Sequence, residues 1–560
     1  MGRFLFVAII ILSTMAGLIV AGIYQEYGFF LIDPQTVIYD FKAQDLKHPE
    51  TLRMFTPYFG AAVSIPMLLL AVAFRFRPKG EYGNSHWATD GEIKKMGLRD
   101  NSGVILGKKN GYLRYGEPLS TLVPAPPGTG KTSGLVIPNA LFYPESLVCI
   151  DIKGEISDAT AHVREKFSRV LILEPTGKSA TKFNPFAKEL LPKDETGLDE
   201  GGVISYVQKV SNLIYPQKKG DQGDSDIWQP NARNIFESLA VYLIYKNGET
   251  SLPEILSFAD EKESIYEWMG QMTNPSNIDE LDDLDDEEPE EEFEMEDPLD
   301  GIPPFVRQEF SSLGQTAYKT FDGYRNTFRT RLLVFKNPTI AENFSSNSFR
   351  FEDFRKGDKP LSLYIKVTEE DLERTATAIR ILFDLLYKYL MSHTPSKDEY
   401  GVLGIFDEFP RMGYLPIVLK MPALGRGYLL PSIFCFQTES QVEEVYEKTG
   451  MRTLWGTTNY KVIFAQSDEG LAKRISDSIG NFTRIKKGDS ESMRDGELKS
   501  QRSKSKNLEG VPLIRQDEIL SLKKNEVIVM TLGNANTPIK AKAAAWHKDR
   551  KMKKLVRSKG

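Results

Sequence analysis

Residues 125–133 read APPGTGKTS, and this stretch decides the fold. It follows an apolar strand pattern, STLVPA (120–125), and a helical pattern begins near Gly130. Glycines between a strand and a helix let backbone N–H groups approach a phosphate, and the helix N-terminus adds a favourable dipole. The context therefore predicts a phosphate-binding loop in an α/β domain.

The residues of this loop have separate expected roles. Lys131 reaches the β- and γ-phosphates of ATP, and the hydroxyl of Thr132 ligates Mg²⁺. The first motif position holds Ala125 in place of glycine, which the loop geometry tolerates, and Pro138 should kink or shorten the following helix. The expected nucleotide-binding residues are Pro127, Gly128, Thr129, Gly130, Lys131, Thr132 and Ser133.

A second apolar strand, GIFDEF (404–409), ends in two adjacent acids. Asp407 is expected to hold the Mg²⁺ shell, and Glu408 to polarise the attacking water. Apolar strands often end in acids, but a phosphate loop elsewhere in the chain makes this pair the best candidate. Asp151 and Glu155, at the end of ESLVCIDIKGE, compete for the same role.

Three further side chains are candidates for the chemistry. Gln437 ends the next apolar strand, LPSIFCFQ, where a sensor of the γ-phosphate would lie, although an ordinary strand-end glutamine is nearly as good an interpretation. Arg426 precedes that strand and is a candidate for an arginine that reaches into a neighbouring subunit and stabilises transition-state charge. Arg411 is its rival.

The rest of the chain alternates between strand and helix patterns from about residue 80. Apolar runs rich in β-branched and aromatic residues, separated by helices, indicate a parallel sheet covered on both faces. Between about 188 and 345 the strand pattern disappears, and residues 227–245 have helical spacing, which predicts an all-α insertion. The remaining expected strands are VLILEP (170–175), LSLYIKV (361–367), LPSIFCFQ (430–437) and NYKVIFAQ (459–466).

The N-terminus predicts a membrane anchor. Residues 4–25 and 54–74 carry no charge, and each is roughly 20 residues long, enough to cross a hydrocarbon core of about 30 Å. The loop between them has five acids against three bases, and basic residues crowd the end of the second stretch. The positive-inside rule then puts both termini in the cytoplasm. The basic residues are Arg75, Arg77 and Lys79.

The net charge of −6 hides an asymmetry. Residues 279–300 hold 15 Asp or Glu and no Lys or Arg, so the rest of the chain carries +9, which permits a polyanionic partner. The acidic run is interpreted as a solvated loop. Residues 484–507 are polar, lack periodicity and are interpreted as a mobile loop.

The two cysteines, Cys149 and Cys435, lie in apolar runs and are expected to be reduced core residues.

Taken together, these motifs resemble the type IV secretion coupling proteins, the TraG/TraD-like ATPases of conjugation and effector export. The resemblance covers nearly the whole chain, and its motifs occur in order at similar spacing. The matching segments are YGNSHWAT (82–89), LVPAPPGTGKTSGLVIPN (122–139), LVCIDIKGE (147–155), FNPF (183–186), DIWQPNAR (226–233), DEFPRMGYLP (407–416), CFQTESQ (435–441), VPLIRQDEILSL (511–522) and NEVIVMTLG (525–533).

The resemblance implies a RecA-like ATPase that forms a homohexameric ring at the bacterial inner membrane. Such a ring hydrolyses ATP and passes single-stranded DNA, the relaxosome or effector proteins to the other components of a secretion channel. The family's trans-acting arginine and sensor glutamine match Arg426 and Gln437. The acidic run 279–300 and the lack of a long C-terminal tail depart from the pattern, so the choice between DNA and protein cargo stays open.

Two alternatives to a motor remain: a recruitment platform that nucleotide binding only switches, and an FtsK-like DNA pump. Glu408 and Arg426 favour turnover over switching, and two spans without a winged-helix pattern disfavour the pump.

The patterns together divide the chain into five segments. They are an anchor (1–79, spans near 4–24 and 54–74), a first nucleotide-binding part (80–187), an all-α domain (188–345), a second nucleotide-binding part (346–545) and a basic tail (546–560).

Overall fold

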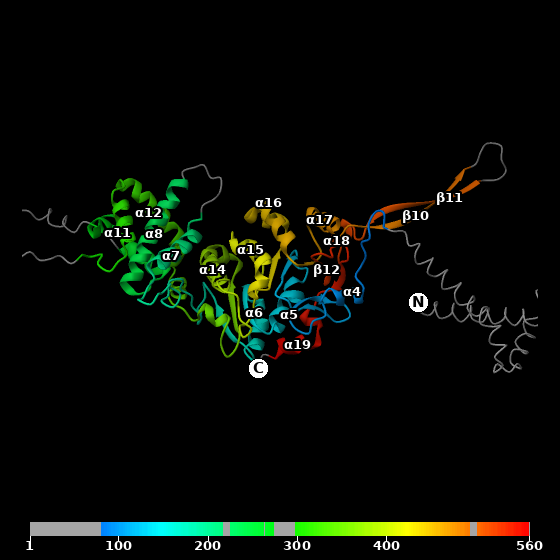
Figure 1. Cartoon of the computed structure of the whole chain (residues 1–560), viewed down its shortest axis with the longest axis horizontal. Coiled ribbons are helices and arrows are strands. Elements are labelled where there is room, and N and C mark those ends of the chain that lie inside the picture. Colours follow the sequence, from blue (N-terminus) through cyan, green and yellow to red (C-terminus); the bar gives the residue numbers. More distant parts are fainter. Residues whose placement is uncertain (1–79, 217–224, 262–263, 274–296, 493–500, 559–560) are drawn as a thin grey trace, which may run out of the picture. The chain divides into compact units, whose positions relative to one another are not determined.

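The computed structural model describes residues 80–216, 225–261, 264–273, 297–492 and 501–558. The chain divides into two compact units, which we describe separately. One unit contains, among the described residues, 80–84 and 481–511. The other contains 85–480 and 512–558 and carries all the candidate site residues (Figure 1).

The large unit is built on an eleven-stranded sheet with the order β2-β1-β13-β12-β9-β3-β8-β7-β4-β6-β5. The strands from β9 to β5 pair in parallel, and those from β2 to β12, with the β12–β9 junction, pair antiparallel. The parallel strands are β3 Ser120–Pro124, β4 Ser146–Ile152, β5 Arg169–Leu173, β6 Leu361–Val367, β7 Val402–Phe406, β8 Ser432–Phe436 and β9 Tyr460–Ile463. The antiparallel strands are β1 Val104–Lys108, β2 Tyr112–Tyr115, β12 Glu526–Thr531 and β13 Ile539–Lys542.

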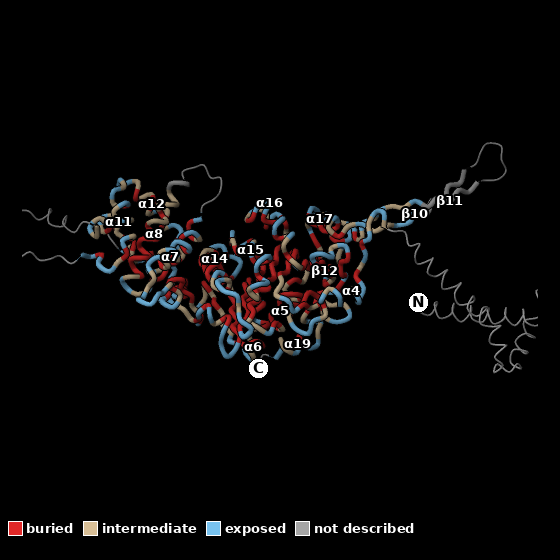
Figure 2. The backbone as a smooth tube through the Cα atoms, viewed as in Figure 1, coloured by how far each residue is buried: buried red, intermediate tan, exposed pale blue. Residues whose placement is uncertain are grey.

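The central strands are buried along their whole length because both faces of the sheet are covered. Every residue of β3, β4, β7 and β8 is buried, and alternate residues of one strand enter different clusters of the core. Val148 packs on one face, for example, and Cys149 on the other. Figure 2 shows buried residues in the interior of the large unit and exposed residues along its outer parts. The predicted mixed α/β class with a mostly parallel sheet is confirmed.

Helices connect the strands and cover the sheet. Residues 132–142 are one helical stretch in two parts, a π-helix followed by an α-helix. The helical segments are α4 Asp90–Lys95, η1 Thr132–Val136, α5 Ile137–Phe142, α6 Glu155–Arg164, α14 Glu369–Leu390, η5 Phe409–Met412, α15 Pro416–Leu424, η6 Gly425–Tyr428, α16 Glu439–Thr457, α17 Glu469–Ile479, α18 Gln516–Leu520, η7 Trp546–Lys548 and α19 Arg550–Arg557. Part of the predicted basic tail is thus helical.

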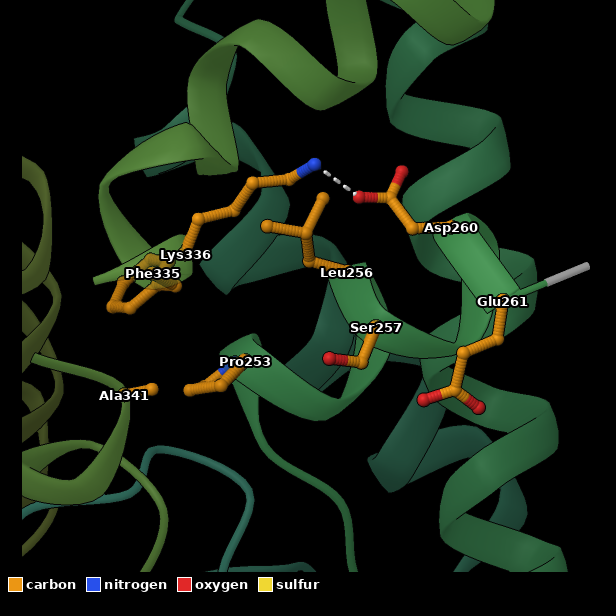
Figure 3. A pocket seen from close by; sticks show the side chains of 8 residues that line it. All are labelled: Pro253, Leu256, Ser257, Asp260, Glu261, Phe335, Lys336 and Ala341. Carbon is orange, nitrogen blue, oxygen red and sulfur yellow. Dashed lines mark ion pairs between the residues drawn. The ribbon is translucent and has the colours of Figure 1, made fainter. Parts of the chain in front are cut away.

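The described elements between β5 and β6 are all helical. Aromatic rings from several of these helices meet edge to face, as Tyr242 and Trp268 do at 5.3 Å between centroids. Figure 3 shows a surface pocket here, where Asp260 pairs with Lys336 at 2.6 Å and with Arg329 at 2.7 Å. The elements are α7 Glu200–Ile214, α8 Ser225–Asn247, α9 Leu252–Glu261, α10 Ile265–Thr273, α11 Pro304–Gly314, α12 Tyr318–Leu332, η3 Leu333–Lys336, α13 Pro338–Asn343 and η4 Phe351–Phe354.

The small unit contains a two-stranded ribbon, β10 Asn481–Ser492 and β11 Gln501–Pro512. The prediction of a loop at 484–507 is therefore wrong for the described residues. The ribbon lacks the apolar alternation of a half-buried strand, which is why the sequence pattern did not indicate it. Its strands are linked by the ion pair of Arg484 with Glu509, at 3.2 Å.

The two predicted membrane spans lie outside the described residues. Within the described part of the chain, no helix combines the length and the apolar character that a membrane crossing requires.

A buried arginine joins three of these elements. Arg164, fully buried at the end of α6, donates hydrogen bonds to the carbonyls of Ala140, Tyr143 and Glu145 and to the hydroxyl of Ser362. Arg164→Met keeps a similar length but leaves these acceptors unpaired. We expect it to destabilise the fold by about 3 kcal/mol or more, and to lower the apparent Tm of the purified protein. Lys166→Met, at an exposed position two residues on, should leave the Tm unchanged, and equal shifts would contradict this account.

Candidate nucleotide site

The loop 125–131 leaves the carboxyl end of β3 and enters a helix. It is anchored at its start, where the N–H of Ala125 donates to the carbonyl of Phe436 at the end of β8 (2.9 Å). Gly128 and Gly130 have φ of 76° and 98°, which favour glycine over residues with a Cβ. The helix opens as the π-helix η1, and Pro138 is the second residue of α5. From the sequence, Pro138 is expected to kink or shorten the helix. The structure has a change from π-helix to α-helix next to it, so the proline lies in the first turn of α5, where its missing N–H is tolerated.

The backbone of the loop fits a phosphate. Among the described residues, no hydrogen-bond acceptor is recorded for the N–H groups of Gly128, Gly130, Lys131 and Thr132. Unpaired N–H groups at the start of a helix form a site for an anion. The predicted cradle residues are thus gathered in one turn with their donors available.

Lys131 extends from this turn to the end of β7. Its Nζ lies 2.6 Å from Oδ1 of Asp407 and 3.7 Å from Oε1 of Glu408. Lys131 and Asp407 are 8% and 6% exposed, so each charge is paired inside the protein. Burial alone lowers the pKa of Lys131, but the negative charges of Asp407 and Glu408 more than offset it and raise that pKa above its usual value.

Glu408 has two polar partners besides Lys131. Nε2 of Gln437, just after β8, donates to its Oε1, and Nε of Arg411 lies 3.0 Å from its Oε2. Arg411 also pairs with Glu369, the first residue of α14. The backbone of Glu408 has φ 59° and ψ 48°, a left-handed conformation that is uncommon for a residue with a side chain.

The side chains near the loop also fit a magnesium ion. Thr132 and Asp407 offer a hydroxyl and a carboxylate, the hard oxygen donors that Mg²⁺ prefers. Lys131 neutralises the charge of Asp407 in this structure. If Lys131 turned to the phosphates of a bound nucleotide, Mg²⁺ would have to neutralise Asp407 in its place.

The competing acids have other environments. Asp151 is fully buried and accepts hydrogen bonds from the N–H groups of Ile156 and Ser157, which satisfies the start of α6. Burial raises its pKa, although the hydrogen bonds from Ser157 oppose this shift. Glu155 is exposed at the first position of α6. Neither acid forms an ion pair with Lys131.

Arg426 does not join this group. It lies on η6 before β8, is exposed, and pairs with Glu117, just before β3, at 2.9 Å. Glu117 is at the amino end of β3 and the phosphate loop is at its carboxyl end. The five residues of β3 separate the two by roughly 16 Å.

The sequence patterns missed a contact from the C-terminal strands. A Cβ added to Gly134 of η1 would lie 2.7 Å from Cβ of Ala543, and the N–H of Ala544 donates to the carbonyl of Gly134. Asn525 is also close to the loop, since its buried Oδ1 would lie 3.4 Å from a Cβ at Gly130. We call Asn525, Ala543 and Ala544 the C-terminal clamp. Small residues after a strand carry no pattern that would have revealed it.

The comparisons with known proteins now bear on these residues. A family model described as "Type IV secretory system Conjugative DNA transfer" matches residues 86–559. The chain belongs to this family. The resemblance inferred from the sequence motifs is thereby confirmed.

Individual relatives support the same assignment. Protein VirD4 of Agrobacterium fabrum is 25% identical over 573 residues, which cover 98% of this chain and 79% of that protein. The conjugal transfer protein TraG of Escherichia coli is 25% identical over 400 residues, 65% of this chain and 58% of TraG. The plasmid coupling protein TrwB, solved with ADP and Mg²⁺, has a TM-score of 0.55 at 17% identity and covers 83% of this chain and 97% of TrwB. This last likeness shows that the two proteins share a fold.

The clamp makes a prediction about nucleotide binding. Gly134→Ala places a methyl group against Ala543, and relief of the clash must move either the clamp or the phosphate loop. We expect overpacking to cost about 1–3 kcal/mol, with an increase in the Kd of a fluorescent ATP analogue. Gly91→Ala, in helix α4 with nothing within 4 Å of the added atom, is the matched control and should bind like wild type. Unchanged affinity and stability in Gly134→Ala would mean that the clamp does not constrain the loop.

Proposed function

We propose that this chain is the coupling ATPase of a type IV secretion or conjugation system. It binds Mg-ATP at the phosphate loop, hydrolyses it, and drives or licenses the transfer of single-stranded DNA with bound protein, or of effector proteins, to the secretion channel. The observation that carries this proposal is the contact of Lys131 with Asp407 and Glu408, in a chain of the conjugative DNA transfer family.

The proposed ligand is Mg-ATP. TrwB has been solved with ADP and Mg²⁺ and with a non-hydrolysable ATP analogue, and this chain presents the groups such a ligand needs. The N–H groups of Gly128, Gly130, Lys131 and Thr132 hold the phosphates, and the side chain of Lys131 neutralises the β- and γ-phosphates. Thr132 and Asp407 complete the shell of Mg²⁺, which supplies charge neutralisation at the transferred phosphoryl group.

Glu408 is the proposed base that orients the attacking water. Its carboxylate is fixed between Gln437 and Arg411, so its direction is set by residues of its own chain. The hydrogen bond between Gln437 and Glu408 supports a role for Gln437 as a sensor that links the γ-phosphate to Glu408. Arg411 is committed to Glu408 and Glu369, which leaves Arg426 as the better candidate for the trans-acting arginine.

The exposed position of Arg426 supports a ring. At the amino end of the strands it cannot serve the phosphate loop of its own chain, but an exposed guanidinium can reach a neighbour. A homohexamer would repeat this arrangement at every interface. The proposed partners are the other secretion components and the relaxosome or effector proteins. Single-stranded DNA is expected to stimulate hydrolysis.

The proposed location is the bacterial inner membrane, with both termini in the cytoplasm. The uncharged stretches 4–25 and 54–74 and the basic residues after the second one support it.

ATP hydrolysis with and without single-stranded DNA tests the proposal. We expect Glu408→Gln to bind a fluorescent ATP analogue like wild type but to turn over about 10²–10⁴ times more slowly, since it loses the base. Lys131→Ala should lose both binding and turnover. Glu370→Gln, at an exposed position of α14, is the matched control and should hydrolyse like wild type. Wild-type turnover that is negligible with DNA and lipid present would instead favour a recruitment platform.

Mixing of subunits tests the trans-acting arginine. Arg426→Ala and Glu408→Gln should each be inactive alone, yet mixed rings contain interfaces with one intact Glu408 and one intact Arg426 from the neighbour. We expect part of the activity to return in the mixture. Arg411→Ala mixed with Glu408→Gln is the control, because both side chains belong to the same site and no mixed interface repairs it. Absence of rescue for Arg426→Ala at any ratio would exclude the trans role.

A further inference from the structure

The last helix of the described chain has one strongly basic face. In α19, Arg550, Lys553, Lys554 and Arg557 follow the i, i+3, i+4, i+7 spacing that places side chains on one side of a helix. Lys548 and Lys551 add two exposed cations beside them. We call these six residues the basic face of α19.

This face is rigid because the opposite side of the helix is packed. Met552 is fully buried in a core cluster, against which Leu555 and Val556 also pack. Nε2 of His162, on α6, lies 3.1 Å from the carbonyl of Leu555. Figure 1 shows α19 close to α5 and α6. A surface that is already ordered loses little entropy when it binds.

The described part of the chain provides no carboxylate partner for the basic face. None of its six cations forms an ion pair with a carboxylate of the described residues. The acid in their midst, Asp549, is engaged elsewhere: it caps α19, pairs with Lys108 and accepts a hydrogen bond from Tyr112 at 2.7 Å. Cations three and four positions apart on a helix repel one another, and a bound polyanion would relieve that repulsion.

We infer that the basic face of α19 docks the phosphate backbone of a single-stranded nucleic acid, an inference that rests on the proposed function. The helix is roughly 12 Å long, which suits about three successive phosphates. A lipid surface is the poorer fit, because the apolar side of α19 is buried in the protein and has nothing left to insert into a bilayer.

The position of α19 also suggests why cargo would affect hydrolysis. The helix begins six residues after Ala544, whose N–H donates to Gly134 of the phosphate-loop helix. A nucleic acid bound to α19 would therefore be coupled to the phosphate loop through the C-terminal clamp. We therefore expect binding of the nucleic acid to this face to change the rate of ATP hydrolysis.

Charge removal with a matched control tests the inference. The variant is Arg550→Gln, Lys554→Gln and Arg557→Gln together, in the full-length detergent-solubilised protein. The control changes three exposed lysines without ion partners elsewhere: Lys94→Gln, Lys95→Gln and Lys319→Gln. Binding of a fluorescein-labelled oligothymidylate is measured by anisotropy over a series of salt concentrations, together with ATPase activity with and without the oligonucleotide.

We expect the variant to bind at least about tenfold more weakly, and the slope of log K against log salt to fall by about 2, near 0.7 for each lost phosphate contact. Its ATPase activity without DNA should equal that of wild type, and its stimulation by DNA should be lost. The control should keep the wild-type slope. A second variant, Lys548→Gln with Lys551→Gln, removes two cations beside the three expected phosphate contacts, and it should lower the slope by less than the triple variant does.

Three outcomes would overturn the inference. The first is a salt slope that changes equally in the variant and the control. The second is unchanged oligonucleotide binding with lost flotation on phosphatidylserine vesicles, which would assign the face to lipid. The third is a wild-type protein that hydrolyses no ATP and binds no oligonucleotide, which would remove the proposed function too. Wild-type binding with an unaffected variant rejects only the role of α19.

Discussion

The structure depends on a single buried ion pair, Lys131 with Asp407. It joins the turn after β3 to the end of β7, two strands separated in the sheet by β8. Removing a buried charge from water is costly, and the cost is met only if the partner stays in place. The sheet therefore has to hold these two strand ends at a fixed separation, and its parallel, doubly covered architecture does so. When a nucleotide binds, its phosphates would pair with Lys131 and its metal ion with Asp407. The buried charges would then exchange partners, and neither would be left unpaired.

Around this pair, much was predictable from the sequence because the signals were local. Strand β7 is an unbroken apolar run, and a run that ends in Asp407 and Glu408 can be recognised without knowing its neighbours. The juxtaposition with Lys131 could be expected because the carboxyl ends of parallel strands meet at one edge of a sheet. The family motifs extended that expectation to Arg426 and Gln437, whose roles remain proposals.

What could not be predicted is non-local or lacks pattern. The antiparallel strands β1, β2 and β13 are four or five residues long, and β13 alternates lysine with small or apolar residues. The sequence of the ribbon β10–β11 is mostly polar and lacks apolar alternation, so it carries no hydrophobic pattern that would indicate the pairing. The link from Glu408 through Arg411 to Glu369 joins residues about forty positions apart, and only coordinates place them together.

The C-terminal clamp also constrains how the protein is made. Gly134 lies in the first strand–helix unit of the parallel sheet, whereas its partners Ala543 and Ala544 are synthesised some four hundred residues later. Contacts between such distant positions slow folding, since a long loop must close before they form. While a ribosome is still translating, β9 presents an unpaired edge where β12 will pair. The nucleotide site of a nascent chain is therefore completed only after Ala544 has emerged from the ribosome, and a chain terminated before β12 would expose that edge to aggregation.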